Sequence, residues 1–535
     1  MLINFFKTAW RNILRYKAYS VINFVGLTCG LTLALLVFTY TRSELSYDQF
    51  NDKASRLYRL WYLVPNGLKL ADTPPPIAPL LKDYFPEVEE AGRLYRRNVT
   101  VKLPESTQSF EENDIVFADS AITKMFTIQF VSGDPSRALK DKYTVLLNEE
   151  MAIKYFGNKN PVGESLMLAG RHLFKVTGVV KNFPESSHIR FNMLVPYDDM
   201  FELEDEKTAA VLRRNLAQNF AISHSFTYVL LKEGATPSSI DEKMPDFLKK
   251  SANPRALFGQ AFFMMPITDI HLKSTFLDEP RPTNSMTTIF VFVAAGILTL
   301  LIACINYINL STAQSLTRIK EIGIRKIMGS LKYQLITQFL AESFLFCFIA
   351  LVMSFVAFDF ALPVLNLLTD KHLQFIQVID SPLLLTSIGL LVIVTLLAGG
   401  YPAYFVTKFE SVSALKGSGY RGHGSQLLRK TLVVVQLTIA SILFSGTIMI
   451  VKQLNYLIDR PLGFDKEQVV NIPLFSQNMN SIFQQTDSSF RQRIQNFRTR
   501  IERQNGIKST TLSSSAIGTD ALFRGIVPEG FLKGR

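Results

Sequence analysis

The chain has 535 residues, of which 48% are hydrophobic and only 19% are charged. The apolar residues gather in long windows without charge, which a bilayer requires and a soluble core does not, so the composition excludes a soluble cytosolic enzyme and a disordered protein. The net charge is +12, and the content of three Cys excludes a disulfide-stapled secreted scaffold.

Five apolar windows are long enough to cross the bilayer as helices, since a crossing takes about 20 residues. Four of them carry no charge, and the window at residues 343–369 is interrupted only by Asp359. The sequence therefore predicts an α-helical membrane protein with a large α+β periplasmic domain and five transmembrane helices in this chain. We place the helices at residues 20–42, 286–312, 340–365, 382–407 and 431–452.

Basic residues gather in three segments beside these windows, at residues 1–17, 318–333 and 408–430. Each segment has four more Lys and Arg than Asp and Glu, so together they account for the whole net charge of +12. The positive-inside rule places all three in the cytoplasm, and the N-terminus with them. We therefore predict a multi-pass protein of the bacterial inner (cytoplasmic) membrane, with an interfacial amphipathic helix at residues 1–19. Because the charge is juxtamembrane, no nucleic-acid partner is expected.

The segment at residues 43–285 is charged, mixed and rich in turns, which is typical of a folded domain outside the membrane. A helix at residues 44–56 is expected to continue the first membrane helix. Further helices are expected at residues 78–84 and 149–156. Strands are expected at residues 57–64, 115–118, 144–147, 172–180 and 225–231.

Motifs for catalysis or metal binding are missing from the sequence. Its six His are scattered, with no pair at ligand spacing. No Walker A lysine motif occurs, and in the loop-like run at residues 157–165 Glu164 stands where the lysine would have to be. We predict no catalytic residue, no bound cofactor and no metal, and so no enzyme activity of the chain itself.

The cytoplasmic loop at residues 313–339 contains RIKEIGIRKIMGS, at residues 318–330. Apolar residues at helical spacing predict a short amphipathic helix whose stripe runs through Ile319, Ile322, Ile327, Leu331 and Leu335. One interpretation is an interfacial connector between two membrane helices. The other is a docking helix that fits a groove of a cytoplasmic partner. The residues alone leave both open.

Three segments complete the predicted order. A short periplasmic loop is expected at residues 366–381, a second cytoplasmic loop at 408–430, and an external segment at 453–535.

RIKEIGIRKIMGS, together with QFLAES at residues 338–343, closely resembles the loop of the MacB/FtsX-type permeases of ABC transporters. Further motifs resemble other parts of that family in the expected order. These are WRNILRYKAYS at residues 10–20, NEEMAIKYFGNKNPVG at 148–163, VTGVV at 176–180, IHL at 270–272, AGGYPAY at 398–404 and ALKG at 414–417.

The resemblance implies a coupling helix that contacts a separate cytoplasmic ABC ATPase, which binds the ATP. The coupling residues that it implies are Arg318, Glu321, Gly323, Arg325, Lys326 and Gly329. It also implies a MacB-like periplasmic core domain at residues 43–285 and the start of a second, incomplete one at residues 453–535. Whether the chain is a fragment or its second half is degenerate stays open.

We expect a permease subunit that couples ATP hydrolysis by the partner to mechanical motion of its periplasmic domain. The motion would export or extract a substrate from the periplasm or the outer leaflet, because the apolar helices lack the polar face of a channel. Membrane lipids and a periplasmic adaptor or outer-membrane protein are further expected partners. One alternative is a regulatory or signalling complex that controls a periplasmic hydrolase or senses an envelope-active peptide. Another is a membrane-anchored binding protein without an ATPase.

Overall fold

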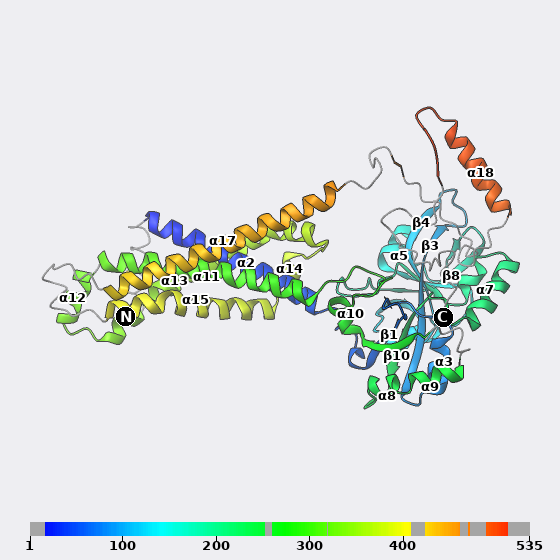
Figure 1. Ribbon diagram of the computed structural model, residues 1–535, viewed down its shortest axis with the longest axis horizontal. Coiled ribbons are helices and arrows are strands. Elements are labelled where there is room, and N and C mark those ends of the chain that lie inside the picture. Colours follow the sequence, from blue (N-terminus) through cyan, green and yellow to red (C-terminus); the bar gives the residue numbers. More distant parts are fainter. Residues whose placement is uncertain are drawn as a thin grey trace, which may run out of the picture.

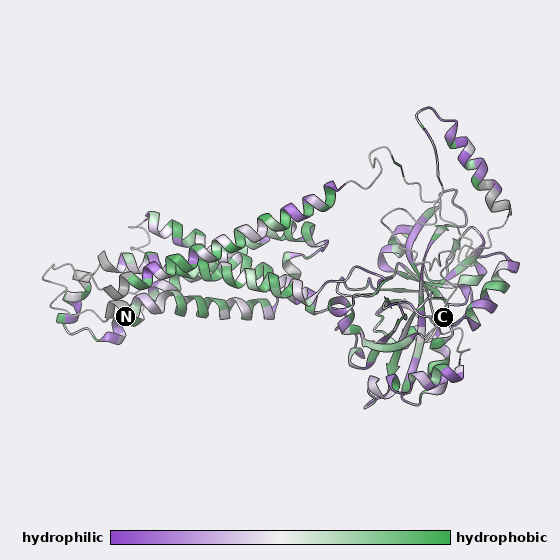
Figure 2. Ribbon diagram, in the orientation of Figure 1, coloured by the Kyte–Doolittle hydropathy of each residue, from purple (hydrophilic) through white to green (hydrophobic). Residues whose placement is uncertain are grey.

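The computed structural model describes residues 17–251, 259–317, 319–407, 423–460, 469–470 and 488–511. A bundle of long helices forms one part of the molecule, and an α+β domain lies beyond one end of the bundle (Figure 1). Hydrophobic residues run along the bundle, whereas hydrophilic residues are frequent over the domain (Figure 2). The predicted fold class, a membrane bundle with a large α+β domain, is confirmed.

Within the described ranges, five helices are long and apolar enough to cross a membrane, as predicted. Four of them pack around one apolar core, and the fifth packs against α11 and leaves its apolar side chains exposed. The five helices are α2 (Lys17–Leu45), α11 (Met286–Thr317), α13 (Lys332–Thr369), α15 (Ser381–Thr407) and, as the exposed one, α17 (His423–Asp459).

Glycine allows two close approaches inside the bundle. A Cβ atom on Gly30 of α2 would lie 2.9 Å from the Cβ of Ala303 on α11. A Cβ atom on Gly399 of α15 would lie 2.6 Å from the side chain of Ser343 on α13. Small residues at helix contacts matter in a bilayer because packing, and not the hydrophobic effect, holds the helices together there.

The domain is built on one mixed sheet, in which the described residues form eleven strands. Its main path runs β11–β1–β10–β3–β4–β9–β6–β8–β5, with β2 beside β1 and β7 beside β3 and β8. The pairs β4–β9 and β6–β8 are parallel and the other pairs are antiparallel. The strands are β1 (Leu57–Leu63), β2 (Lys69–Leu70), β3 (Val88–Lys102), β4 (Phe110–Ala118), β5 (Phe130–Gly133), β6 (Thr144–Asn148), β7 (Ser165–Leu168), β8 (His172–Val180), β9 (Met193–Pro196), β10 (Phe226–Leu231) and β11 (Ala261–Pro266).

Short helices cover the sheet and enclose separate apolar cores. One core includes Leu81 and Phe247, and another includes Met151 and Leu212. Local sequence sets the start of α5, because the side chain of Asn148 accepts a hydrogen bond from the backbone N of Met151 at 2.8 Å. The helices are α3 (Ile77–Tyr84), α4 (Ile122–Met125), α5 (Glu149–Phe156), α6 (Asp199–Glu202), α7 (Glu206–Gln218), α8 (Pro237–Asp241), α9 (Met244–Ser251) and α10 (Ile267–Lys273).

The expected strands and helices of the domain lie on observed elements, with one exception. The helix predicted at residues 44–56 is wrong, because α2 ends at Leu45 and turns follow it. Asp48 takes a left-handed φ of 60° there, and its backbone N donates to the carbonyl of Ser186 at 2.8 Å. Contacts with the domain therefore replace the helical hydrogen bonds at this point.

Three predicted segments lie mainly outside the described residues. The interfacial helix at residues 1–19 overlaps the structure only where α2 begins. The loop at residues 408–430 is described only from residue 423 onward, and of the segment at 453–535 the structure describes the end of α17, residues 469–470 and a stretch around α18 (Ser488–Glu502).

Candidate functional site

The predicted coupling loop lies at the end of the bundle that is remote from the domain (Figure 1). It forms the short helix α12 (Ile319–Ile327) between α11 and α13. The chain then turns at Gly329, whose φ is +91°, a backbone conformation that glycine adopts without strain. The loop is therefore a compact helical turn between two membrane helices.

Two contacts fasten α12 to α13. Ile322 is buried in a small apolar cluster with Leu335 and Phe339 of α13. Arg325 Nη1 donates a hydrogen bond to Gln338 Oε1 at 3.0 Å. A displacement of α12 would therefore be passed to the first turns of α13.

The predicted coupling residues share this loop but differ in exposure. Gly323 is buried, Arg325 and Lys326 are half-buried, and Gly329 is exposed. Burial lowers the pKa of Lys326, and the neighbouring charge of Lys332 lowers it further. The side chains of Arg318 and Glu321 lie outside the described residues.

The single apolar stripe predicted along the loop is wrong. The helix ends at Ile327, so Leu331 and Leu335 lie beyond a turn and do not continue its face. Among the described side chains of α12 and the turn after it, the apolar ones left exposed are Ile324, Ile327 and Met328, at 47%, 59% and 83%. They form an exposed apolar surface at this end of the bundle.

Polar side chains inside the bundle gather near this same end. They line a small pocket between α2, α11 and α13, which includes Tyr19, Gln314, Ser315, Glu342 and Ser343. Further along the bundle, the described core is mostly apolar and contains Leu27, Leu31, Leu35, Phe358 and Leu362. Thr32 and Ser354 are also buried there, and their hydroxyls donate to backbone carbonyls of their own helices. The polar lining therefore stops part of the way through the bundle.

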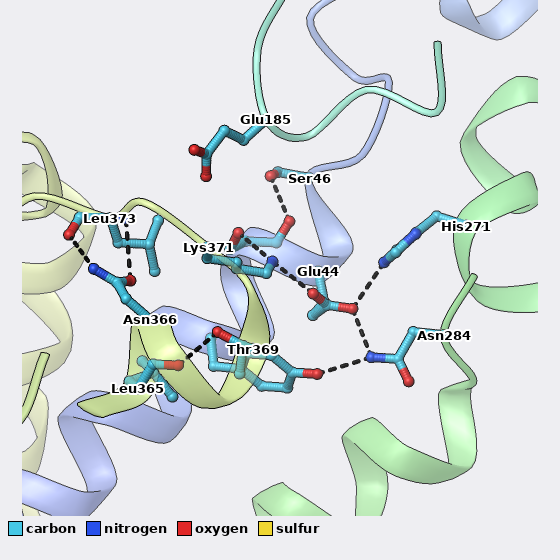
Figure 3. Close-up of polar contacts among 12 residues, drawn as sticks. Glu44, Ser46, Glu185, His271, Asn284, Leu365, Asn366, Thr369, Lys371 and Leu373 are labelled. Carbon is cyan, nitrogen blue, oxygen red and sulfur yellow. Dashed lines mark hydrogen bonds and ion pairs between the residues drawn. The ribbon is translucent and has the colours of Figure 1, made fainter. Parts of the chain in front are cut away.

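A second cluster lies where the bundle meets the domain (Figure 3). At its centre is Glu44 in the last turn of α2, whose side chain is 3% exposed. Glu44 Oε2 forms hydrogen bonds with His271 Nε2 at 2.8 Å and with Asn284 Nδ2 at 2.7 Å. Glu44 Oε1 lies 2.5 Å from Lys371 Nζ. We call Glu44, Tyr47, His271, Asn284 and Lys371 the junction cluster.

The junction cluster joins four segments of the chain. His271 belongs to α10 of the domain, and Asn284 lies in the segment that leads from the domain into α11. Lys371 lies in the loop after α13, before α14 (Phe375–Val378). A buried carboxylate is tolerated only when it is paired and hydrogen-bonded. The charge of Glu44 therefore holds these segments against the end of α2.

Aromatic rings shield this carboxylate from water. The ring of Tyr47 stacks on His271, with centroids 3.4 Å apart and planes within 3°. Lys371 Nζ lies 5.4 Å from the ring centroid of Tyr40, within reach of a cation–π contact. Burial raises the pKa of Tyr47 to about 12, and the charge of Glu44 adds to this effect, so the Tyr47 hydroxyl stays neutral.

Two outer contacts reinforce the junction. Arg42 Nη2, also near the end of α2, lies 2.5 Å from Asp380 Oδ2 at the start of α15, and this hydrogen bond lowers the pKa of Asp380. The backbone N of His372 donates to Glu185 Oε2 of the domain at 3.1 Å. The loop between α13 and α15 therefore contacts both α2 and the domain.

Buried polar contacts continue from the junction into the sheet. His188 Nδ1 lies 2.8 Å from Asp48 Oδ2, and His188 Nε2 lies 2.9 Å from the Tyr228 hydroxyl on β10. On the neighbouring strand β1, the fully buried Arg59 pairs with Glu279 in the segment before α11. These contacts tie the segment after α2 to β10, and the segment before α11 to β1.

Sequence reasoning missed the junction cluster. Glu44 belongs to none of the motifs found in the sequence, and Lys371 is a single basic residue in a short loop. His271 falls in the IHL motif at residues 270–272, but that motif assigned it no role. The one usable signal was position, since Glu44 follows directly on the first apolar window.

Two family models match separate parts of the chain. The MacB-like periplasmic core domain matches residues 20–247, and the FtsX-like permease C-terminal domain matches residues 293–411. The first match covers nearly all of α2 and most of the sheet domain, and the second covers most of α11 and all of α12, α13 and α15.

Two curated relatives are similar to the chain at low identity. The macrolide export ATP-binding/permease protein MacB of Bdellovibrio bacteriovorus is 24% identical over 282 residues, which are 51% of this chain and 38% of that protein. The probable syringafactin export ATP-binding/permease protein SyfD of Pseudomonas syringae is 20% identical over 424 residues, 77% of this chain and 58% of that protein. The chain thus spans less than two thirds of either relative.

Solved structures of periplasmic or extracellular domains are also similar to part of the chain. The periplasmic region of MacB from Actinobacillus actinomycetemcomitans matches with a TM-score of 0.29 at 14% identity, over 41% of this chain and 91% of that one. The extracellular domain of the noncanonic ABC-type transporter YknZ matches with a TM-score of 0.27 at 17% identity, over 39% of this chain and 99% of that one.

Proposed function

Because the chain is a permease of the MacB/FtsX type, we propose that it is the membrane subunit of an ABC transporter and works with a separate ATPase. The absence of a Walker A motif from its sequence supports the assignment of ATP hydrolysis to a separate subunit. In this proposal the N-terminus and α12 face the cytoplasm, where the ATPase docks, and the sheet domain faces the periplasm.

One observation carries the mechanical part of the proposal: α13 touches the coupling loop at one end and leads into the junction cluster at the other. Its 38 residues span about 57 Å at the usual rise of an α-helix. Gln338 near its start binds Arg325 of α12, and Lys371, two residues past its end, binds Glu44. Movement of α12 by the ATPase would therefore reach the domain through one continuous helix.

The cargo is proposed to be handled outside the membrane core. The polar pocket of the bundle lies near α12, and the described core beyond it is mostly apolar, with the buried hydroxyls of Thr32 and Ser354 already bonded to backbone carbonyls. A polar cargo would lose its hydration there without compensating partners. The domain would instead act on a substrate in the periplasm or the outer leaflet, and the export function in the names of the curated relatives supports this direction.

Affinity purification of the full-length protein from native membranes, followed by mass spectrometry of bound proteins and lipids, tests the proposal. We expect an ABC ATPase subunit in the complex. A stable complex with a periplasmic hydrolase and no ATPase would contradict the proposal and favour the regulatory alternative.

A further inference from the structure

A cleft in the sheet domain gathers three arginine side chains around one opening. Arg96 extends from β3, Arg190 from the segment before β9, and Arg281 from the segment before α11. The same cleft has apolar walls that include Leu94, Val116 and Phe226. It therefore combines positive charge with an apolar surface, as a site for an amphiphilic anion would.

The cleft lies on the side of the domain that faces the bundle. Arg190 Nη2 donates to the carbonyl of Glu185 at 2.5 Å, and the carboxylate of Glu185 accepts from the backbone of His372 in the loop between α13 and α15. Arg281 stands five residues before the first residue of α11. Two of the three arginines are thus close to the outer ends of membrane helices.

Positive charge in the cleft exceeds the negative charge that it contacts. Arg96 and Arg281 both pair with the carboxylate of Asp114. Arg96 Nη1 lies 3.2 Å from Asp114 Oδ1, and Arg281 Nη2 lies 2.9 Å from Asp114 Oδ2. Two of the three guanidinium groups therefore share one carboxylate, and Arg190 has no ion pair among the described residues.

The arginines also have N–H groups that these contacts do not use. A guanidinium has five N–H groups, and Arg190 Nε is buried without a hydrogen-bond partner among the described residues. Burial lowers the pKa of Arg281, and the charges of Arg190 and Arg96 lower it further, which reports mutual repulsion in the cleft. All three remain charged at neutral pH because an arginine keeps its proton. An added anion would relieve this repulsion.

We propose that this arginine cleft binds the phosphate group of an anionic headgroup at the outer surface of the membrane. Arginine suits this task because its planar fork donates two hydrogen bonds to phosphate oxygens. The placement at the outer surface rests on the proposed periplasmic side of the domain, whereas phosphate binding itself requires neither the ATPase nor transport.

The test measures binding to the purified full-length chain by isothermal titration calorimetry. The probes are dihexanoyl phosphatidylglycerol, dihexanoyl phosphatidylcholine and inorganic phosphate, each below micelle-forming concentration. The main variant is Arg190→Gln, which removes a charge that Asp114 does not pair with, and Arg190→Lys retains the charge. Arg213→Gln is the control, because Arg213 is a half-exposed arginine of the same domain that pairs with Glu202.

We expect phosphatidylglycerol to bind more tightly than phosphatidylcholine, and Arg190→Gln to weaken it about tenfold, as loss of one charge-assisted hydrogen bond would. Arg190→Lys should weaken it less, and Arg213→Gln should leave it unchanged. If inorganic phosphate binds with the same dependence on Arg190 and phosphatidylglycerol binds no more tightly, the cleft takes free phosphate and the headgroup assignment is overturned. Equal effects of Arg190→Gln and Arg213→Gln, or no preference for the net anionic probes over zwitterionic phosphatidylcholine, would also overturn the proposal.

Should Arg190→Gln fail to fold, Arg96→Gln replaces it, because the Arg96 side chain is 44% exposed and tolerates the change more readily. The same tenfold loss is expected from this variant. Unchanged binding of phosphatidylglycerol and phosphate by a folded Arg96→Gln protein would count against the cleft.

Discussion

Glu44 connects the bundle to the domain through its ion pair with Lys371 and its hydrogen bonds with His271 and Asn284. Glu44→Gln keeps its shape but leaves the cation of Lys371, which is 9% exposed, without its buried partner. Breaking a buried ion pair costs about 3–5 kcal/mol. We expect Glu44→Gln to lower the unfolding temperature of the purified chain, and to reduce export severely while the partner's ATP hydrolysis persists.

The control for this prediction is Glu87→Gln, because Glu87 pairs with a Lys243 side chain that is 56% exposed. Exposed pairs contribute about 0–1 kcal/mol, so this variant should behave like the wild type. Equal unfolding temperatures and export for the two variants would show that the junction cluster is not a mechanical joint.

Asp72 gives the domain a defined pH dependence. Burial raises its pKa to about 7, and the nearby carboxylate of Asp278 adds to the shift. The unfolded-state pKa is about 3.9. Since ionisation is harder in the folded state, the free energy of unfolding should fall as pH rises from about 4 to about 7, and this effect should level off above pH 7.

The measurement uses the fluorescence of Trp61 in a Trp10→Phe background, since Trp61 on β1 stacks against Phe263 of β11. Thermal unfolding of the purified chain should occur at a lower temperature at pH 8 than at pH 5. Asp72→Asn should shrink this difference. If the unfolding temperature changes equally between pH 5 and pH 8 with and without Asp72, other groups cause the change.

The sequence could not reveal the junction cluster because its contacts are long-range. His271 lies 227 positions from Glu44 along the chain, and Lys371 lies further still. Each residue alone is an ordinary polar side chain near the end of an apolar window. Only the folded chain brings three donors to one carboxylate, so no local pattern could mark Glu44 as the centre of the site.

Elements of the domain were predictable where their signals are local. The start of α5 follows from the Asn148 cap, and the strands follow from runs of β-branched and aromatic residues. The end of α2 was not predictable, because Asp48 leaves the helix to bind Ser186 and His188 of the domain. The exposed face of α12 was also missed, since the turn at Gly329 interrupts the periodicity.

At the scale of elements, the contact of α12 with α13 gives a coupling prediction. Arg325→Glu replaces the donor that binds Gln338 with an acceptor, and Gly329→Leu forces a β-carbon into a left-handed turn. We expect both variants to be expressed normally, and to reduce export about tenfold relative to the ATP hydrolysed. The readout is the ratio of export to ATP hydrolysis in the complex with its ATPase.

Arg137→Glu is the matched charge reversal for that experiment, because the Arg137 side chain is 74% exposed and belongs to the sheet domain. That domain lies at the opposite end of the bundle from α12 (Figure 1). It should leave the ratio unchanged. Normal export by both Arg325→Glu and Gly329→Leu would reject the docking assignment.

At the scale of the whole molecule, α12 and the sheet domain lie at opposite ends of the bundle (Figure 1). With basic segments in the cytoplasm, the turn at Asn66 between β1 and β2 should be periplasmic, and the chain near Gly422 cytoplasmic. Alkaline phosphatase fused at Asn66 should be active, and at Gly422 inactive. An active cytoplasmic reporter at Asn66 would reverse the orientation.

The central claim is that the bundle transmits motion and does not conduct cargo. Accessibility of single cysteines along α2, α11 and α17, in a chain without Cys29, Cys304 and Cys347, tests it most directly. Because the polar pocket stops near α12, a water-soluble thiol reagent should label positions at the helix ends and around Ser315, and leave the middle of each helix unlabelled. A labelled helical stripe through the whole depth of the membrane would show a conducting pore and contradict the mechanical account.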